Sequence, residues 1–237
     1  MKIRIKFCKW GVMKFVGHLD MMRYFQKAMR RADIDICYSE GFSPHPVMSF
    51  AAPLGVGLTS DGEYLDIEVH SSPASREALS ALNDVMVEGV KTVSYVRLPD
   101  NAKAAMSLVA AADYRLRIRE GCDSRSTAEW EEMIRREFWD RKEFVITKKT
   151  KKSEREVDLK PLVYALSVRE EEGKPAFYMT VSTGSTDNVK PELVLSSICG
   201  RCGISLPAEA VRIHRMEIYA RENGGLIPLK DMGEELT

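Results

Sequence analysis

Apolar and charged residues alternate at the start of the chain. In MKIRIKFCKW, the apolar residues Ile3, Ile5 and Phe7 are separated by single Lys or Arg residues. A period of two is typical of a strand with one buried face, so these residues predict an opening strand. From His18 to about Ile34 the apolar residues recur every three to four positions. This spacing predicts a helix whose outer face is basic.

The remainder of the first half predicts a turn, two strands, a helix and a strand. Gly, Ser and Pro are dense in CYSEGFSPHP, which indicates a turn, and VMSFAAPL and EYLDIEVH follow as strands. SPASREALSALNDVM begins with a Ser-Pro pair that favours a helix start, and VEGVKTVSYVRL again has strand character. The order in residues 1–98 is therefore β-α-β-β-α-β.

The same order recurs after residues 99–112, which we expect to link the two halves either as a short helix or as an irregular crossing. Residues 113–222 carry extended segments around two helical ones, and the second helix is expected to start at Pro191 and end at Gly203. Two such halves favour an α+β fold of tandem ferredoxin-like domains, each with an antiparallel sheet and its helices on one face. The last segment, 223–237, is Gly-rich and then acidic, so we expect it to be loosely ordered.

Composition indicates a folded protein of the cytoplasm. Of the 237 residues, 44 % are hydrophobic and 30 % are charged, which is ordinary for a globular chain. The first residues contain no apolar stretch like that of a signal peptide, and no window approaches the roughly 18 apolar residues of a membrane span. Five cysteines are too few, and odd in number, for a disulfide framework. We therefore expect a cytoplasmic location and no membrane partner.

Charge is segregated along the chain although the net charge is zero. Residues 1–31 hold nine Lys or Arg against one acid, Asp20, which gives a local balance of +8. Residues 141–155 hold seven Lys or Arg against two acids, which gives a balance of +5. The two regions would form a footprint for a polyanion if the fold brings them together. The alternative is that both are solvated surfaces.

Motifs of catalysis and metal binding are incomplete. Cys199 and Cys202 form a CxxC pair near a predicted helix end, with no second pair or HxxxH to complete a zinc site. Redox pairs sit instead where a helix begins. Nucleotide-binding, hydrolase and metalloprotease motifs are absent from the sequence, as is a CxxxCxxC triple for an iron–sulfur cluster. We therefore predict no metal and no cofactor.

The stretch from His18 to His45 is the richest in candidate binding residues. His18, Asp20 and Arg23 start the predicted helix, where Asp20 would simply complement the helix dipole. Alternatively, the basic helix face and the turn from Ser39 to His45 form one pocket for a phosphate or a flipped base, with rings available for stacking. The predicted nucleic-acid-binding residues of this stretch are Arg23, Lys27, Arg30, Arg31, Tyr38, Ser39, Phe42 and His45.

A second basic motif, TKKTKKSEREVDLKP, is expected in or beside a hairpin turn between two strands. Lysines are flexible point charges that follow phosphates without reading sequence. Asp158 would orient Arg155 through a charge-assisted hydrogen bond, and the alternative is a solvated hairpin tip. The predicted nucleic-acid-binding residues here are Lys148, Lys149, Lys151, Lys152 and Arg155.

Three separated motifs resemble the DUF2344 family of radical SAM-associated proteins. They are GHLDMMRYFQKAMRRADIDICYSEGFSPHPVMSFAAPLGVG, KKTKKSEREVDLKPLV and STGSTDNVKPELVLSSI, which together span nearly the whole chain. The resemblance implies a stand-alone member of an uncharacterised family, with a radical SAM protein as a separate partner chain, and supplies no biochemical activity. It places motif positions at His18, Asp20, Arg23, Arg30, Arg31, Ser39, Gly41, Phe42, Pro44, His45, Pro46, Lys148, Lys151, Arg155, Asp158, Pro161 and Asn188 to Pro191.

Three functional hypotheses follow from the sequence. The leading one is an accessory protein without catalytic activity of its own, which binds RNA rather than DNA for a partner radical SAM enzyme. The alternative is an enzyme acting on RNA or a small molecule, with His18, Asp20 and His45 as acid–base groups in one pocket. A third is a protein-interaction module, whose signature would be an exposed apolar patch.

Overall fold

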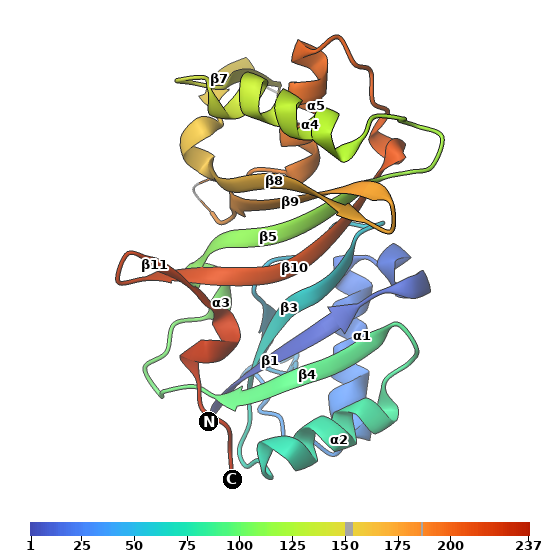
Figure 1. The fold of residues 1–237 in the computed structure, drawn as a ribbon. Coiled ribbons are helices and arrows are strands. Elements are labelled where there is room, and N and C mark those ends of the chain that lie inside the picture. Colours follow the sequence, from blue (N-terminus) through green and yellow to red (C-terminus); the bar gives the residue numbers. More distant parts are fainter. Residues whose placement is uncertain (150–153, 186) are drawn as a thin grey trace. The chain divides into compact units, whose positions relative to one another are not determined.

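The computed structural model describes residues 1–149, 154–185 and 187–237. The chain forms two compact units, shown in Figure 1. Unit 1 comprises Met1–Ala110 and Arg215–Thr237, and unit 2 comprises Ala111–His214. Each unit combines antiparallel strands with helices, so the predicted α+β class is confirmed. The finer assignment to tandem ferredoxin-like domains stays a prediction.

Unit 1 is built on a sheet in which β1 pairs antiparallel with both β3 and β4, and β2 pairs antiparallel with β3. After unit 2, β10 returns to this sheet beside β3 and pairs antiparallel with β11. The elements are β1 (Lys2–Lys9), the 3-10 helix η1 (Gly11–Phe15), α1 (His18–Arg31), β2 (Met48–Phe50), β3 (Thr59–Glu68), α2 (Ser75–Val85), β4 (Val90–Arg97), α3 (Ala105–Leu108), β10 (Val211–Glu222), β11 (Gly225–Pro228) and the 3-10 helix η5 (Leu229–Met232).

The core of unit 1 lies between one face of the sheet and the two helices α1 and α2. The alternating apolar residues of β1 are buried there, as the period of two predicts. The ring of Phe7 lies 4.7 Å from that of Phe25 on α1, and Phe25 lies 5.8 Å from Phe50 on β2. Leu82 brings α2 into the same cluster. Both helices therefore cover one face of the sheet, and the other face is left for polar side chains.

The C-terminal segment is ordered, so the expectation of a loose tail at 223–237 is wrong. Arg4 points away from the helices and is only 1 % exposed, and its guanidinium donates to the Leu229 carbonyl at 3.2 Å. The main chains of Glu234 and Arg97 exchange two hydrogen bonds of 2.8 and 2.9 Å. Because a buried guanidinium needs acceptors, the segment is held by partners far away in the sequence rather than by its own composition.

One glycine allows this segment to approach β4 closely. A Cβ atom at Gly233 would lie 2.6 Å from the Arg97 carbonyl oxygen and 2.9 Å from Val96 Cγ2. We expect Gly233→Ala to lower the free energy of unfolding by about 1–3 kcal/mol, as overpacking does, and to expose the C-terminal segment to proteases. Urea unfolding and limited proteolysis check this. Gly225→Ala is the matched control, since its Cβ would meet nothing closer than 3.6 Å; equal sensitivity of the two variants would contradict the expectation.

Unit 2 has a sheet in the order β5-β9-β8 with antiparallel pairing, and β6 and β7 pair as a separate hairpin. The second basic motif was expected in or beside such a hairpin, and β6 and β7 confirm the two strands. The elements are β5 (Val109–Ile118), α4 (Thr127–Ile134), the π-helix η2 (Arg135–Trp139), β6 (Val145–Lys149), β7 (Glu154–Asp158), the 3-10 helix η3 (Lys160–Leu162), β8 (Val163–Glu171), β9 (Lys174–Ser182), α5 (Pro191–Arg201) and the 3-10 helix η4 (Ala208–Ala210).

The units differ from the predicted domains 1–98 and 113–222 in two places. Residues 99–112 contain the short helix α3, one of the two expected forms of the link, but also the start of β5. The last predicted strand, β10, belongs to unit 1 from Arg215 onward. Alternation identifies a strand but not its neighbours, so the sequence pattern alone did not show that β10 is divided between the two units. In the part of the chain that the structure describes, no helix has the length and apolar character needed to cross a membrane.

Candidate functional site

The exposed face of α1 is basic. Arg23, Lys27 and Arg30 are exposed at spacings of four and three residues, which places them on one face of the helix, about 10 Å from end to end. Arg31 is also exposed and donates to the Val85 carbonyl at 3.2 Å. Asp20 pairs with Arg23 at 3.1 Å, whereas Lys27 and Arg30 form no ion pair or side-chain hydrogen bond with any described residue. Lys27 and Arg30 are therefore available to an anionic partner.

Much of the remaining positive charge in residues 1–31 is not on the surface. Arg4 and Lys9 are 1 % and 2 % exposed. Lys6 pairs with Glu217 at 2.7 Å, and Lys2 donates to a main-chain carbonyl at 2.9 Å. The local balance of +8 therefore overstates the field at the surface, and α1 carries most of the positive charge that a partner could reach.

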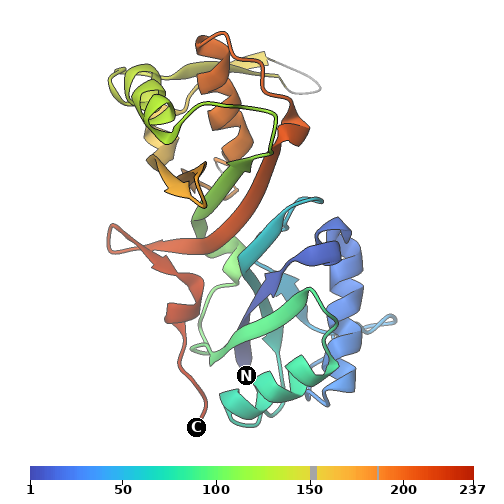
Figure 2. The same ribbon diagram turned by 45° about the vertical axis from the view of Figure 1, so that its right-hand side comes forward.

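The residues from Cys37 to Val47 form a projecting hairpin, which we call the arm. The N–H group of Val47 donates to the Cys37 carbonyl at 2.8 Å, and the N–H group of Ser39 donates to the His45 carbonyl at 2.9 Å. The Cys37 N–H donates in turn to Glu68 at the end of β3. In Figure 2 this segment, drawn in light blue, stands out from the helices and strands of unit 1. The predicted turn is thus a projecting hairpin whose base is hydrogen-bonded to β3.

The tip of the arm presents aromatic side chains to solvent. The Ser39 hydroxyl lies 2.9 Å from His45 Nδ1 and also accepts the His45 N–H at 3.1 Å, which closes the hairpin below its tip. Gly41 has a φ of +105°, a value that favours glycine. Phe42 next to it is fully exposed, and Tyr38 is 53 % exposed. Both rings are available for stacking against a partner.

The three proposed acid–base groups lie in separate surroundings. His18 packs edge-on against Phe50 with ring centroids 5.3 Å apart. His45 belongs to the arm and bonds to Ser39, and Asp20 is exposed on the surface of α1. Within the described ranges, no contact joins any two of the three. The structure therefore does not bring these residues together as one pocket.

A buried ionic cluster lies near His18 and was not expected from the sequence. Arg215 donates to both carboxylate oxygens of Glu63, at 2.8 and 2.5 Å, and to the Ala52 carbonyl at 2.7 Å. Lys9 donates to the Val16 carbonyl at 2.7 Å, and burial lowers the pKa of its ammonium group, with Glu63 opposing that shift. The sequence did indicate the burial of Lys9, since Lys9 follows the buried residues Ile3, Ile5 and Phe7 at the same period of two.

This cluster is structural rather than a substrate site. Lys9, His18 and Glu63 line a cavity of about 20 Å³ together with apolar side chains. A space of this size holds about one water molecule. The cluster instead ties β1, β3 and the unit 1 part of β10 to one another.

The second basic motif is described only in part. Lys148 and Lys149 end β6, and Arg155 pairs with Lys148 across the hairpin backbone, while Lys151 and Lys152 lie outside the described residues. Asp158 accepts the N–H groups of Phe144 at 2.8 Å and Lys160 at 3.0 Å. Asp158 thus holds the backbone at the base of the hairpin. Its orienting role toward Arg155 stays a prediction, because the Arg155 side chain lies outside what the structure describes.

The CxxC pair lies at the end of α5, as predicted, with Gly203 in a left-handed conformation after the helix. Cys199 is buried, and burial raises the pKa of its thiol to about 11, which disfavours the reactive thiolate. Across the described ranges, His, Cys, Asp and Glu side chains form no group of three or more that could hold a metal ion.

These observations define an α+β protein of two units, the first of which carries a basic helix face and a projecting aromatic arm. Residues 2–191 match the family model described as "Uncharacterized protein conserved in bacteria (DUF2344)", and the chain belongs to this family. The predicted resemblance is thereby confirmed. The association with a radical SAM protein stays a prediction.

One solved structure, titled "Crystal Structure of a Cbf5-Nop10-Gar1 Complex", contains a chain similar to this one. The TM-score is 0.51 at 12 % sequence identity, and the match covers 97 % of this chain and 53 % of that chain. This chain thus spans about half the length of its structural neighbour, and at this identity the likeness concerns the fold alone. No curated protein matches the sequence.

Proposed function

We propose that the protein binds RNA through unit 1 as a cytoplasmic accessory to a radical SAM protein on a separate chain. The observation that carries the proposal is the row of exposed cations on α1, of which Lys27 and Arg30 have no described anionic partner. Exposed cations without internal partners can neutralise phosphates and release counterions, which is the main source of affinity for nucleic acids.

The arm favours unpaired RNA over a duplex. Proteins recognise single-stranded RNA by stacking its bases on aromatic rings, whereas the bases of a duplex are already stacked on each other. Phe42 and Tyr38 present such rings to solvent, and the Ser39–His45 closure holds the hairpin in shape. The α1 cations and the arm would therefore act on the backbone and the bases of one strand.

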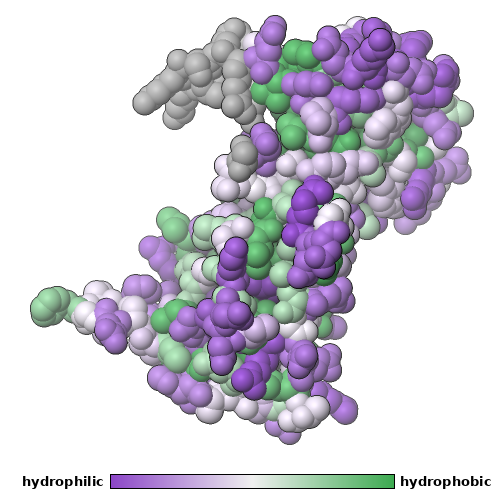
Figure 3. Space-filling view, turned by 90° about the vertical axis from the view of Figure 1, so that its left-hand side faces the viewer, coloured by the Kyte–Doolittle hydropathy of each residue, from purple (hydrophilic) through white to green (hydrophobic). Residues whose placement is uncertain are grey.

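A second candidate function, docking to a partner protein, is favoured by an exposed apolar patch at one end of unit 1. Val12, Phe15, Leu19 and Val56 are 76, 65, 70 and 61 % exposed. Scattered single apolar residues are normal, but a group on adjoining segments marks an interaction surface. The face drawn in Figure 3 is mostly hydrophilic, with scattered hydrophobic areas. RNA binding and docking of the radical SAM protein can coexist.

We expect Lys27→Gln/Arg30→Gln to weaken RNA binding roughly tenfold at low salt, because two phosphate contacts are lost. The slope of log affinity against log salt should become shallower by about 1.4, since each contact to a single strand contributes about 0.7. Filter binding of a labelled single-stranded RNA between 50 and 200 mM salt measures both quantities.

The matched control replaces two exposed cations of unit 1 that lie off α1, in Arg76→Gln/Lys91→Gln. Its affinity and salt slope should stay near those of the unmodified protein. The proposal fails if the unmodified protein shows no salt-dependent RNA binding, or if both double variants weaken binding equally.

A further inference from the structure

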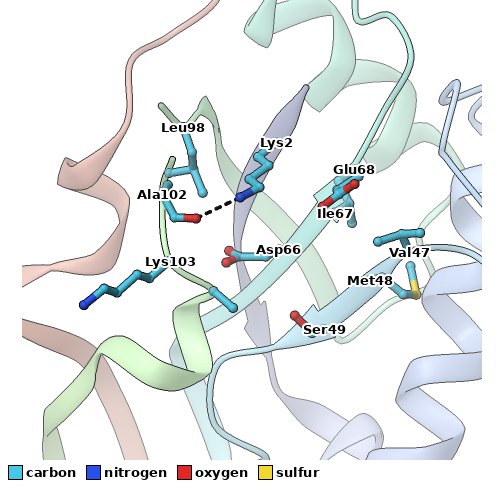
Figure 4. Close-up of a pocket in the computed structure, with 11 residues that line it drawn as sticks. Lys2, Val47, Met48, Ser49, Asp66, Ile67, Glu68, Leu98, Ala102 and Lys103 are labelled. Atoms are coloured by element: carbon cyan, nitrogen blue, oxygen red, sulfur yellow. Dashed lines mark hydrogen bonds between the residues drawn. The ribbon is translucent and has the colours of Figure 1, made fainter. Parts of the chain in front are cut away.

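A cavity opens on the face of the unit 1 sheet opposite the helices. Part of that face is covered by the C-terminal segment, where Leu229 and Met232 lie against Arg4. Between β2, β3 and the residues after β4, a cavity of about 190 Å³ stays open (Figure 4). Pockets for drug-sized ligands measure roughly 300–1,000 Å³, so this space fits a single ring system rather than a whole nucleotide.

The walls of the cavity are mostly apolar. Val47, just before β2, and Met48, the first residue of β2, contribute side chains, and Leu98 and Ala102 contribute from the residues that follow β4 (Figure 4). Val47 is also the last residue of the arm, where its N–H group bonds to Cys37. The base of the arm therefore forms part of the cavity wall, which links the cavity to the stacking residues.

Two carboxylates on one face of β3 line the cavity. Asp66 and Glu68 are two residues apart and so point the same way from the strand. Asp66 is held in place by Arg4, whose Nε and Nη2 donate at 2.8 and 3.0 Å, and its Oδ2 also accepts the Ala105 N–H at 2.7 Å. A carboxylate has about four acceptor sites, so Asp66 keeps one free on Oδ1.

The charge at the cavity excludes a cationic ligand. Lys2 donates to the Ala102 carbonyl at 2.9 Å beside the cavity, and Lys103 extends away from the other lining side chains (Figure 4). The two lysines balance the two carboxylates, and Arg4 adds one positive charge. The surroundings therefore suit a neutral ring whose attached phosphate meets the lysines, and whose N–H groups meet the carboxylates.

We propose that this cavity binds one unpaired nucleobase with an exocyclic amino group, which donates to Asp66 or Glu68. The inference rests on the proposed RNA binding and adds its base preference. Carboxylates accept from the amino group of cytosine, as in direct readout of DNA, whereas uracil offers a carbonyl at the same position and would be repelled. The cavity thus selects cytosine-containing over uracil-containing single strands.

The test compares labelled cytidine and uridine octamers by fluorescence anisotropy at one salt concentration. We expect the unmodified protein to bind oligo(C) about tenfold more tightly than oligo(U), as one specific base contact provides. Glu68→Ala should bring this ratio close to one while binding of oligo(U) stays equal or rises, because a negative charge is lost. Val47→Trp, which fills the cavity, should also remove the preference, and thermal unfolding verifies that both variants are folded.

The controls separate this inference from the proposed function. Glu77→Ala removes an exposed acid on α2 and should raise both affinities alike. Lys27→Gln/Arg30→Gln should lower both affinities and keep their ratio. Equal binding of the two octamers by the unmodified protein overturns the cavity inference alone, whereas absence of binding to either octamer overturns RNA binding itself.

Discussion

Replacing Arg215 by Met is expected to lower the free energy of unfolding by about 3–5 kcal/mol. Glu63 and Arg215 are each 3 % exposed, and the guanidinium satisfies both carboxylate oxygens of Glu63. Without Arg215, the Glu63 carboxylate is buried with only the charge of Lys9 nearby, and the Ala52 carbonyl loses a donor. Urea unfolding followed by circular dichroism measures the loss, and hydrogen exchange of the amides of β1 and β3 assigns it to unit 1.

The double variant Glu63→Leu/Arg215→Met is the informative control for this pair. Replacing both members of a buried ion pair by apolar residues is often close to neutral, because neither charge is then left unpaired. Lys9 would lose its only described carboxylate neighbour in the cluster, so we expect the double variant to fall between the unmodified protein and Arg215→Met. A double variant less stable than the single variant would show that the pair itself, rather than an unpaired Glu63, dominates the energetics.

The same cluster shows where the sequence pattern was sufficient and where it was not. Alternation predicted β1 and its inward face correctly, because a half-buried strand requires a period of two. Lys9 follows Ile3, Ile5 and Phe7 in that series, but a count of charges treats every lysine as exposed. Burial of Lys9 depends on acceptors at Val16 and on the charge of Glu63, which no local pattern contains.

Long-range partners also explain the error in the C-terminal segment. The Gly-rich and acidic composition of 223–237 resembles that of a mobile tail. Its order comes from bonds to residues more than a hundred positions away, such as Leu236 to Ser75 at 2.8 Å and Leu229 to Arg4. The cavity was missed for the same reason, since its walls come from β2, β3 and the residues after β4. Local periodicity could predict the secondary structure of these segments, but not which of them lie side by side in the fold.

Part of the candidate RNA-binding surface, the α1 face and the arm, could be predicted from the sequence. The basic face of α1 follows directly from the spacing of its charged residues, and the density of Gly, Ser and Pro identified the arm as a turn. The availability of Phe42 for stacking was also predicted, but the extent of its exposure was not, because an aromatic residue in a turn is often packed against the body of the protein. The Phe42 ring is available for stacking because the arm projects from the sheet, and not because of its residue type.

In unit 2, Trp130→Ala is expected to lower the free energy of unfolding by about 3–5 kcal/mol. Trp130 is fully buried on α4, and its ring lies perpendicular to that of Phe177 on β9, with centroids 4.9 Å apart. Its Nε1 donates to Asp123 Oδ2 at 2.8 Å. The substitution removes the largest buried side chain of the chain's described part and leaves a cavity between helix and sheet. Urea unfolding measures the change in the free energy of unfolding. Circular dichroism is the better signal than fluorescence, because removing a tryptophan changes the fluorescence itself.

Trp130→Phe separates packing from hydrogen bonding at this position. Phe keeps most of the apolar volume and the contact with Phe177, but it cannot donate to Asp123. The Asp123 carboxylate keeps its ion pair with Arg125, so we expect a loss of about 1–2 kcal/mol, close to that of one hydrogen bond and a small void. If Trp130→Phe is as destabilising as Trp130→Ala, the bond to Asp123 rather than the packed ring holds α4 against the sheet. The loop between β5 and α4, which contains Asp123, is then the element on which the stability of unit 2 depends.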